Sequence, residues 1–552
     1  MKIRLLILCI ALIVPALAFA GGQGEGSAGS KILPTAPGQF PIVSEPVTLT
    51  VFVAPAPFLG DFNTSDVTPW YEDLTGVHID WMQVAQQDKE QKLTLMLSSG
   101  SDLPDVFSTG LSNEQQIVYG SQGILLSLND LIDEWGYGIN DLYKLEPITE
   151  KVITAPDGNI YALPKLNECY HCKYAQRAWI NVPWLENLGL EMPETTDDLY
   201  EVLKAFKEND ANGNGKADEV PMMNVYNSWH SAVTDFLMNP FTFNPDSGTL
   251  WRYIEDGKVV FAPTQPGWRD GLKYINKLYE EGLIDPESYT IDTNGIRQLT
   301  ENPDGNRVGF TTGGHHGMFT ALDADGAKND FEPIGPLTGP SGLKQAPVYY
   351  TGITGNYAIT KDSEYPEIAY RWGETMYLRE EEADDGAVIG TILGSRGVLG
   401  KGWRRAEPGE LGITGEQASW VRLVEWGTPH NAHWGQNIPG ISNGTTYYFS
   451  LASAQGAWDL EHELWKASTY AIKPHGIENK ALPPLFLDLE TTKELSEPLA
   501  NLRQTVNEWN ALFVTGKRDI DADWDDFLKA LDNVGLAQIL EVSTEAYNRQ
   551  YQ

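Results

Sequence analysis

Short apolar runs rich in β-branched residues alternate along the chain with segments of helical periodicity. Alternation of this kind indicates an α/β architecture with parallel sheets. Strands are predicted at Val47–Val53, Val77–Val84, Leu103–Phe107, Asn159–Leu163, Ala178–Val182, Arg307–Thr311 and Tyr357–Thr360. Helices are predicted at Trp70–Leu74, Lys89–Ser98, Gly267–Glu281, Tyr365–Leu378, Glu497–Phe513, Trp524–Val534 and Leu536–Tyr551.

An acidic loop follows the helix-like segment Leu199–Asn209. Oxygen-bearing side chains recur there at alternate positions around Gly215, as in the first nine positions of an EF-hand loop. Pro221 stands where an EF-hand has its bidentate glutamate, so Glu219 is the nearest substitute and the chain after it is predicted to be extended. A polar, Gly-rich turn without an ion is the alternative. The predicted calcium ligands are the side chains of Asp210, Asn212, Asn214, Asp218 and Glu219 and the backbone carbonyl of Lys216.

The N-terminus has the three parts of a secretory signal peptide. A short basic start precedes the apolar run Leu5–Leu17, and Ala18-Phe19-Ala20 is a small-x-small cleavage site. The run of about 13 residues is too short to span a bilayer, which takes roughly 20. A lipoprotein would need a cysteine just after the cleavage site, whereas Cys9 lies inside the run. We expect cleavage near Ala20, a flexible leader over residues 21–45 and an exported, periplasmic protein.

The composition narrows the possible ligands. A net charge of −37 opposes binding to nucleic acid or to anionic membrane surfaces. A chain of 552 residues predicts two or more domains. Its 17 tryptophans and 24 tyrosines, in an acidic exported protein, favour sugar recognition, because flat rings stack on the apolar faces of pyranoses.

Cys169 and Cys172 form a Cys-x-x-Cys motif. A disulfide closing this small loop is the favoured interpretation in an exported protein. A redox dithiol, a zinc site that includes His171, and two free thiols are the alternatives. The redox interpretation lacks a thioredoxin-like context, and the zinc interpretation lacks a second ligand pair nearby.

Several motifs, in a fixed order over nearly the whole chain, resemble the family 1 extracellular solute-binding proteins of carbohydrate ABC transporters. The similarity is greatest to the branch with LipO-type lipoproteins and alginate-oligosaccharide-binding proteins. LipO-type relatives carry a lipid-anchoring cysteine that this chain lacks. The motifs are Ser98–Val106, Asp157–Pro164, Trp179–Leu190, the Asp210–Glu219 loop with its Asp-Glu-Val-Pro ending, Tyr365-Pro366-Glu367, and Asp523–Phe527 with Gly535-Leu536 and Ala546-Tyr547.

The resemblance implies a type II periplasmic-binding-protein fold, with two α/β lobes and a ligand cleft between them. Lobe one would hold residues 46–165 and about 355–429, and lobe two residues 166–354 and about 430–552. The resemblance also implies that the calcium ion is structural, that the ligand is an oligosaccharide, and that the protein, expected as a monomer, delivers it to membrane permease subunits.

Candidate sugar contacts follow from this placement of the cleft at strand ends and lobe crossings. Each has a structural alternative, as core or as support for a loop. Trp184, Trp268, Trp372 and Trp524 lie in helical patterns and are predicted to be core. The candidate contacts are Ser108, Arg177, Trp229, His230, His315, Tyr350 and Trp434, of which Trp229, His315 and Trp434 are expected to reach the same cleft.

We therefore expect a non-catalytic carbohydrate receptor. A secreted polysaccharide-cleaving enzyme is one alternative, but paired carboxylates are easy to find among 76 acidic residues and are no evidence for it. A calcium-dependent adhesion or scaffold module is the other, although such modules usually carry repeated loops.

Overall fold

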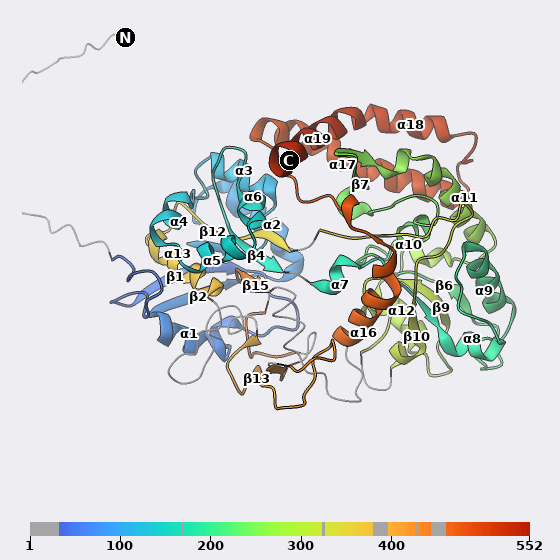
Figure 1. The fold of residues 1–552 in the computed structure, drawn as a ribbon, viewed down its shortest axis with the longest axis horizontal. Helices are drawn as coiled ribbons and strands as arrows, with labels where there is room; N and C mark the ends of the chain where they lie inside the picture. Colours follow the sequence, from blue (N-terminus) through green and yellow to red (C-terminus); the bar gives the residue numbers. More distant parts are fainter. Residues whose placement is uncertain are drawn as a thin grey trace, which may run out of the picture.

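The chain folds into two α/β lobes that lie side by side in the computed structural model (Figure 1). The structure describes residues 32–167, 169–322, 326–350, 352–378, 396–418, 420–424, 429–435, 437–442 and 460–552. The predicted signal peptide, with Cys9, and the first part of the predicted leader lie outside the described residues. The leader prediction is wrong for its second part, because Ile42 and Val43 are buried in the core of lobe one.

Lobe one is built on a six-stranded sheet. Its order is β15 (Gly440–Ser442), β4 (Leu163–Asn167), β12 (Ile353–Ile359), β3 (Val106–Ser108), β1 (Val47–Val53) and β2 (Val77–Gln83). The strand β1 runs parallel to β2 and β3, but β12 runs antiparallel to β3 and β4. The expectation of purely parallel sheets is therefore wrong, since β12 returns from lobe two into the middle of the sheet.

Seven helices of the described residues pack around this sheet. The helix α1 ends at Gly76, whose φ of 74° places it in the left-handed region that glycine tolerates. A capping box of Ser112 and Gln115 begins α3. These helices are α1 (Val67–Thr75), α2 (Lys89–Ser99), α3 (Asn113–Ser121), α4 (Asn129–Trp135), α5 (Gly138–Leu145), α6 (Ile148–Ile153) and α13 (Pro366–Glu374).

Lobe two is built on a four-stranded mixed sheet. Its order is β10 (Phe331–Ile334), β5 (Ala178–Asn181), β9 (Val308–Thr312) and β6 (Val220–Met222), with only β6 and β9 parallel. The helices α8 (Val182–Leu188), α9 (Thr196–Glu208), α10 (Val233–Met238), α11 (Pro266–Glu280) and α12 (Thr293–Thr300) belong to this lobe. Two-stranded sheets join β7 (Arg252–Glu255) to β8 (Lys258–Phe261), β11 (Ala346–Pro347) to β16 (Gly476–Ile477), and β13 (Trp403–Arg405) to β14 (Trp420–Arg422).

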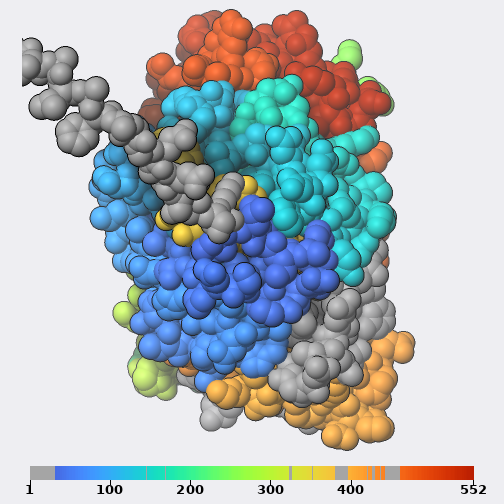
Figure 2. Space-filling model, turned by 90° about the vertical axis from the view of Figure 1, so that its left-hand side faces the viewer, coloured from blue at the N-terminus to red at the C-terminus, as the bar shows by residue number. Residues whose placement is uncertain are grey.

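The chain crosses between the lobes through α7 (Tyr170–Lys173), and returns through the segment between β10 and β12. The C-terminal helices α17 (Leu489–Val514), α18 (Trp524–Asn533) and α19 (Leu536–Tyr551) lie over one end of both lobes (Figure 1). In the view onto lobe one they form the red layer above the blue and cyan helices (Figure 2). The helix α17 contacts α3 of lobe one and α11 of lobe two, so it bridges the lobes. The short α16 (Leu460–Lys466) packs beside α7.

Three sequence predictions differ from the structure. The strand expected at Asn159–Leu163 begins only at Leu163, because the turn at Asp157 and Gly158 leaves Ile160 with a single bridge to Thr154. The helix expected at Glu497 begins eight residues earlier, where Asp488 caps the Thr491 N–H, and it accommodates Pro498 in its interior. Residues 430–442, expected in lobe two, belong to lobe one, because β15 pairs with β4.

None of the described helices combines the length and the apolar character that crossing a membrane requires.

The core assignment of Trp184 is confirmed, since its side chain is buried edge-on against Phe206 at a ring-centroid distance of 5.1 Å. We predict that Trp184→Ala lowers the free energy of unfolding by about 3–5 kcal/mol, because it leaves a cavity in the core of lobe two. Denaturant unfolding measures the change. The matched variant Tyr470→Ala, at a side chain that is 69% exposed, should stay within about 0.5 kcal/mol of wild type. Equal stabilities for the two variants would contradict the assignment.

Candidate functional site

A cavity of about 790 Å³ opens in lobe two beside the segment that returns to lobe one. Its wall is formed by the loop and helix start at residues 225–235, the turn at 246–251, and Ser288 with Tyr289. Tyr349 and Tyr350 close it on the side of the crossing segment, and α17 contributes Asn507 and Asn510. A volume of this size accommodates a ligand of several sugar units, within the range of small-molecule sites.

Trp229 is an aromatic side chain of this wall that remains accessible, with 38% of its surface exposed. Its position depends on Gly314, because a Cβ there would lie 2.0 Å from Trp229 Cε3. The Gly314 N–H also donates to the Trp229 carbonyl at 3.0 Å. The centroid of the Trp229 ring lies 6.0 Å from that of His315 and 6.4 Å from that of His171. The strand-end loop after β9 therefore fixes the tryptophan at the cavity.

His315 is neutral at physiological pH. Burial, together with the neighbouring charges of His171 and Arg177, lowers its pKa to about 4. The rings of Trp229 and His315 are thus neighbours, but His315 is not among the residues that line the cavity. Of the three residues expected to reach one cleft, only Trp229 lines this cavity.

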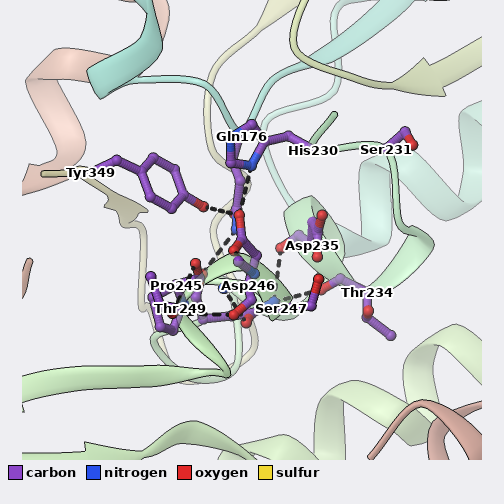
Figure 3. Close-up of polar contacts among 12 residues, drawn as sticks. Gln176, His230, Ser231, Thr234, Asp235, Pro245, Asp246, Ser247, Thr249 and Tyr349 are labelled. Carbon is purple, nitrogen blue, oxygen red and sulfur yellow. Dashed lines mark hydrogen bonds and ion pairs between the residues drawn. The ribbon is translucent and has the colours of Figure 1, made fainter. Parts of the chain in front are cut away.

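A buried polar network holds the wall of the cavity together. Asp246 Oδ2 accepts from Tyr349 Oη at 2.7 Å and lies 2.6 Å from His230 Nδ1 (Figure 3). Asp246 Oδ1 accepts from the Gly248 N–H at 2.6 Å. His230 and Asp246 have φ angles of 52° and 74°, which L side chains rarely adopt. Such backbone strain concentrates at functional sites and persists because surrounding contacts enforce it.

Asp235, the second acidic residue of the wall, is only 5% exposed. Burial raises the pKa of its carboxyl group well above the usual range, and the charge of Asp246 raises it further. Oxygen and nitrogen atoms of His230, Asp235 and Asp246 lie within 4.8 Å of one another. The protonated form of Asp235 is therefore favoured beside the Asp246 carboxylate.

Of the remaining candidates, His230 and Tyr350 line the cavity, but Arg177 does not. Arg177 is fully buried, and its guanidinium donates to the carbonyls of Gly314 and His171 and to Ser468 Oγ. It supports the loop after β9, which contacts Trp229. Tyr350, by contrast, lines the cavity while packing against the core of lobe one.

The predictions for Ser108 and Trp434 need correction, because both lie in lobe one. Ser108 is buried at the end of β3, where its hydroxyl donates to the Asn437 carbonyl at 2.6 Å. Trp434 is 1% exposed, packs on Tyr71 with ring centroids 5.4 Å apart, and donates its indole N–H to Thr68 Oγ1 at 2.9 Å. An aromatic residue between polar neighbours looked accessible in the sequence, but tertiary packing buries it.

Cys169 and Cys172 are joined by a disulfide in the structure, at the start of α7. Sulfur atoms bonded to each other are not thiolate ligands, so the zinc alternative has no support here. His171, inside the small ring, lies with Nδ1 at 3.1 Å from Glu461 Oε2. The disulfide closes a small ring within the crossing segment, and the His171–Glu461 pair ties this segment to α16, next to Trp229.

The loop Asp210–Glu219 connects α9 to β6, and its side chains converge. The amides of Asn212 and Asn214 both donate to Asp218 Oδ1 at 3.1 Å. Gly213 and Gly215 adopt φ angles of 71° and 77°, so the loop can turn back on itself. The extended chain expected after the loop is confirmed as β6.

The donor set of this loop fits a hard cation. Glu219 turns back into the loop, where its carboxylate accepts from the Asp218 N–H at 3.1 Å. The Lys216 ammonium instead pairs with Asp304 at 2.5 Å, outside the ring of oxygen ligands. Carboxylate, amide and carbonyl oxygens are the ligands that Ca²⁺ takes. The donor types of this loop therefore fit the ion that the sequence motif predicts.

Sequence reasoning missed Asp235, Asp246, Tyr349 and the α17 face as parts of the cavity. Asn244-Pro245-Asp246-Ser247-Gly248 has turn-forming composition, which signals a bend but not a site. The amides of Asn507 and Asn510 carry no local signal, since only tertiary folding brings α17 there.

Comparisons with known proteins were made with both the sequence and the structure. The sequence profile described as bacterial extracellular solute-binding protein matches residues 54–383. The fructooligosaccharide ABC transporter substrate-binding protein FusA of Streptococcus pneumoniae serotype 4 is 29% identical over 532 residues, covering 93% of this chain and 92% of FusA. Lipoprotein LipO of Bacillus subtilis is 28% identical over 360 residues, covering 63% of this chain and 66% of LipO.

Solved structures of FusA share the fold. The S. pneumoniae protein in complex with kestose superposes with a TM-score of 0.75 at 26% identity, covering 91% of this chain and 99% of the FusA chain. An EF-hand mutant of FusA in complex with fructo-nystose superposes with a TM-score of 0.74, at the same identity and coverage.

The buried His316 generates a prediction about acid stability. Its ring lies 4.0 Å from that of Trp179, and burial lowers its pKa to about 3. In the unfolded chain the His316 imidazole takes up a proton near pH 6.5, whereas in the folded protein it does so only near pH 3. The contribution of the neutral ring to the free energy of unfolding is therefore complete above pH 6.5 and is lost as the pH falls toward 3. We predict that His316→Gln reduces the loss of unfolding free energy between pH 7 and pH 4 by on the order of 2–3 kcal/mol.

Urea unfolding at a series of pH values measures this slope. Part of the slope should remain in the variant, because burial also lowers the pKa of His315 and of His433, to about 4 and about 2. A variant with the wild-type slope would contradict the role given to His316.

Proposed function

Because the chain belongs to the bacterial extracellular solute-binding protein family, we propose that it captures an oligosaccharide and delivers it to the permease of an ABC transporter. The family predicted from the motifs and the α/β fold are confirmed. The observation that carries the proposal is an accessible tryptophan on a cavity of about 790 Å³, in a fold shared with a kestose-bound relative. The proposal places the sugar in this cavity.

The wall offers the two kinds of contact that a sugar needs. Trp229 presents a flat ring for the apolar face of a sugar unit, and Tyr350 presents a second ring from the crossing segment. His230, Asn507 and neighbouring serine and threonine hydroxyls supply donors and acceptors for the sugar hydroxyls. Aromatic platforms with a few oriented polar groups are typical of ligand pockets.

An enzyme that cleaves the sugar is the second candidate, since Asp235 and Asp246 form a carboxyl pair in the cavity. Retaining glycosidases hold their carboxyl groups about 5–5.5 Å apart and inverting ones about 6.5–9.5 Å. Here carboxylate oxygens of Asp235 and Asp246 lie within 4.8 Å of each other, and the Asp246 carboxylate already accepts from Tyr349 and Gly248 and lies 2.6 Å from His230 Nδ1. This geometry favours the receptor. Prolonged incubation with the bound sugar, followed by mass spectrometry, should return it unaltered, and shortened products would favour the enzyme.

Calcium at the loop Asp210–Glu219 is part of the proposal. The ligands would be the side chains of Asp210, Asn212, Asn214, Asp218 and Glu219 with the Lys216 carbonyl, and the existence of an EF-hand in FusA supports it. The ion would be bound by three carboxylates and would hold the end of α9 against β6. The role is structural, because none of these residues lines the cavity.

Export to the periplasm completes the proposal. The predicted signal peptide ends near Ala20, and the disulfide between Cys169 and Cys172 suits an oxidising compartment.

We predict that Trp229→Ala weakens binding of the identified sugar by about 1–3 kcal/mol, the scale of losing a buried aromatic contact. Isothermal titration calorimetry measures the affinity. Trp434→Ala is the matched control, because this tryptophan lies in the core of lobe one: it should lower the melting temperature and leave the dissociation constant unchanged. The proposed sugar site would be wrong if Trp229→Ala bound as tightly as wild type.

We also predict that calcium raises the melting temperature of the protein and that EGTA lowers it, by mass action on the folded state. The double variant Asp210→Ala, Asp218→Ala should melt at one temperature under both conditions. Asn212→Ala should retain part of the calcium response, because it removes an amide and no charge. Asp304→Ala, which removes only the partner of the Lys216 side chain, should respond like wild type. A full calcium response in the double variant would refute the site.

A further inference from the structure

The charges around the cavity point to the chemical class of its ligand. Of the described residues that line the cavity, Asp235 and Asp246 are acidic and His230 is basic. None of these lining residues is a lysine or an arginine. Asparagine, serine and threonine side chains make up most of the other polar lining. In the described part of the chain, the wall therefore offers no lysine or arginine side chain that could face a carboxylate or sulfate on a sugar.

The arginines close to the cavity already donate to oxygen atoms of the protein. Arg177 donates to two backbone carbonyls and to Ser468. Arg252 donates to the Thr249 carbonyl at 3.2 Å and to Ser543 Oγ at 2.8 Å. Arg503, on the rim, donates to the Ser247 carbonyl at 2.7 Å. Each guanidinium supports the wall, and releasing one for a ligand would leave a carbonyl without its donor.

The two acidic residues of the wall present little free charge to a ligand. Asp246 accepts from Tyr349 and Gly248 and lies beside the His230 imidazole. Burial and the neighbouring Asp246 raise the pKa of the Asp235 carboxyl group well above its usual range, which favours its protonated form. A protonated carboxyl group donates one hydrogen bond and accepts others, as does a sugar hydroxyl.

We propose, resting on the proposed function, that the cavity selects oligosaccharides whose enclosed units carry no charge and that it excludes uronic-acid and sulfated chains. A sugar carboxylate in this cavity would lose its water beside Asp246 without gaining a counter-ion. Burial of an unpaired charge is costly, whereas neutral hydroxyls can pair with every polar group of the wall. A neutral ligand is therefore the only one for which burial leaves no charge uncompensated.

A screen of thermal shifts over neutral and uronate oligosaccharides, followed by titration calorimetry, tests the proposal on the full mature chain. The decisive probes are a tetragalacturonide and its fully methyl-esterified form, together with the neutral tetrasaccharide nystose. The best ligand should be neutral, and any uronate should bind at least about tenfold more weakly than its methyl ester, because esterification removes the charge and keeps the sugar backbone.

Uronate binding that equals or exceeds that of the methyl ester would overturn the selectivity and leave the receptor function standing. Affinity for no sugar in the screen would overturn the proposed function itself, and the inference with it.

Asn507→Lys adds a cation to the lining from the exposed side of α17, where the chain should still fold. It should narrow the difference in affinity between ester and uronate by about threefold or more, the scale of one partly screened charge pair. The matched control is Asn501→Lys, which is exposed on the same helix but does not line the cavity. It should leave the ratio of the ester and uronate affinities unchanged. Equal ratios in the two variants would show that charge in the cavity does not set the selectivity.

Discussion

The buried carboxylate of Asp246 is the constraint on which the candidate site depends. It receives Tyr349 from the crossing segment, His230 from the loop before α10, and the Gly248 N–H of its own turn. A charge so buried is stable only while its partners remain, so three separate segments keep one relative position. The positive φ angles of His230 and Asp246 are the local cost of this arrangement.

The same contacts relate the site to the lobes. Tyr349 and Tyr350 belong to the segment that re-enters lobe one as β12, and Tyr350 packs on the core of that lobe. A ligand that touches Trp229 and Tyr350 would therefore contact groups fixed to both lobes. Two-lobed binding proteins respond to such a ligand by hinge closure, and α17, which contacts both lobes, would limit the range of that motion.

The elements of this fold follow largely from local sequence patterns, whereas the site does not. Val47–Val53 and Leu536–Tyr551 have the predicted bounds, because a β-branched apolar run and a long amphipathic repeat each have one stable solution. The antiparallel insertion of β12 and the return of β15 to lobe one are long-range pairings with no local signal.

Some side-chain positions likewise follow from local sequence, whereas others depend on long-range packing. The predicted ligands of the calcium loop are neighbours in sequence, and the folded loop brings the side chains of Asn212 and Asn214 against Asp218. Trp229 and Trp434 both stand among polar neighbours, yet Gly314 fixes one at the cavity while Tyr71 and Trp81 enclose the other. Exposure of an aromatic residue depends on what the rest of the chain packs against it, and one partner of Asp246, Tyr349, is 103 residues away in the sequence.

The central claim is that this cavity is where an oligosaccharide binds. A crystal structure of the protein grown with the sugar identified by screening tests it most directly. The account predicts electron density for a sugar unit stacked on Trp229, with its hydroxyls within hydrogen-bonding distance of the wall formed by His230, Asp235 and Asn507. Density for the sugar at another surface, with this cavity filled by water alone, would contradict it.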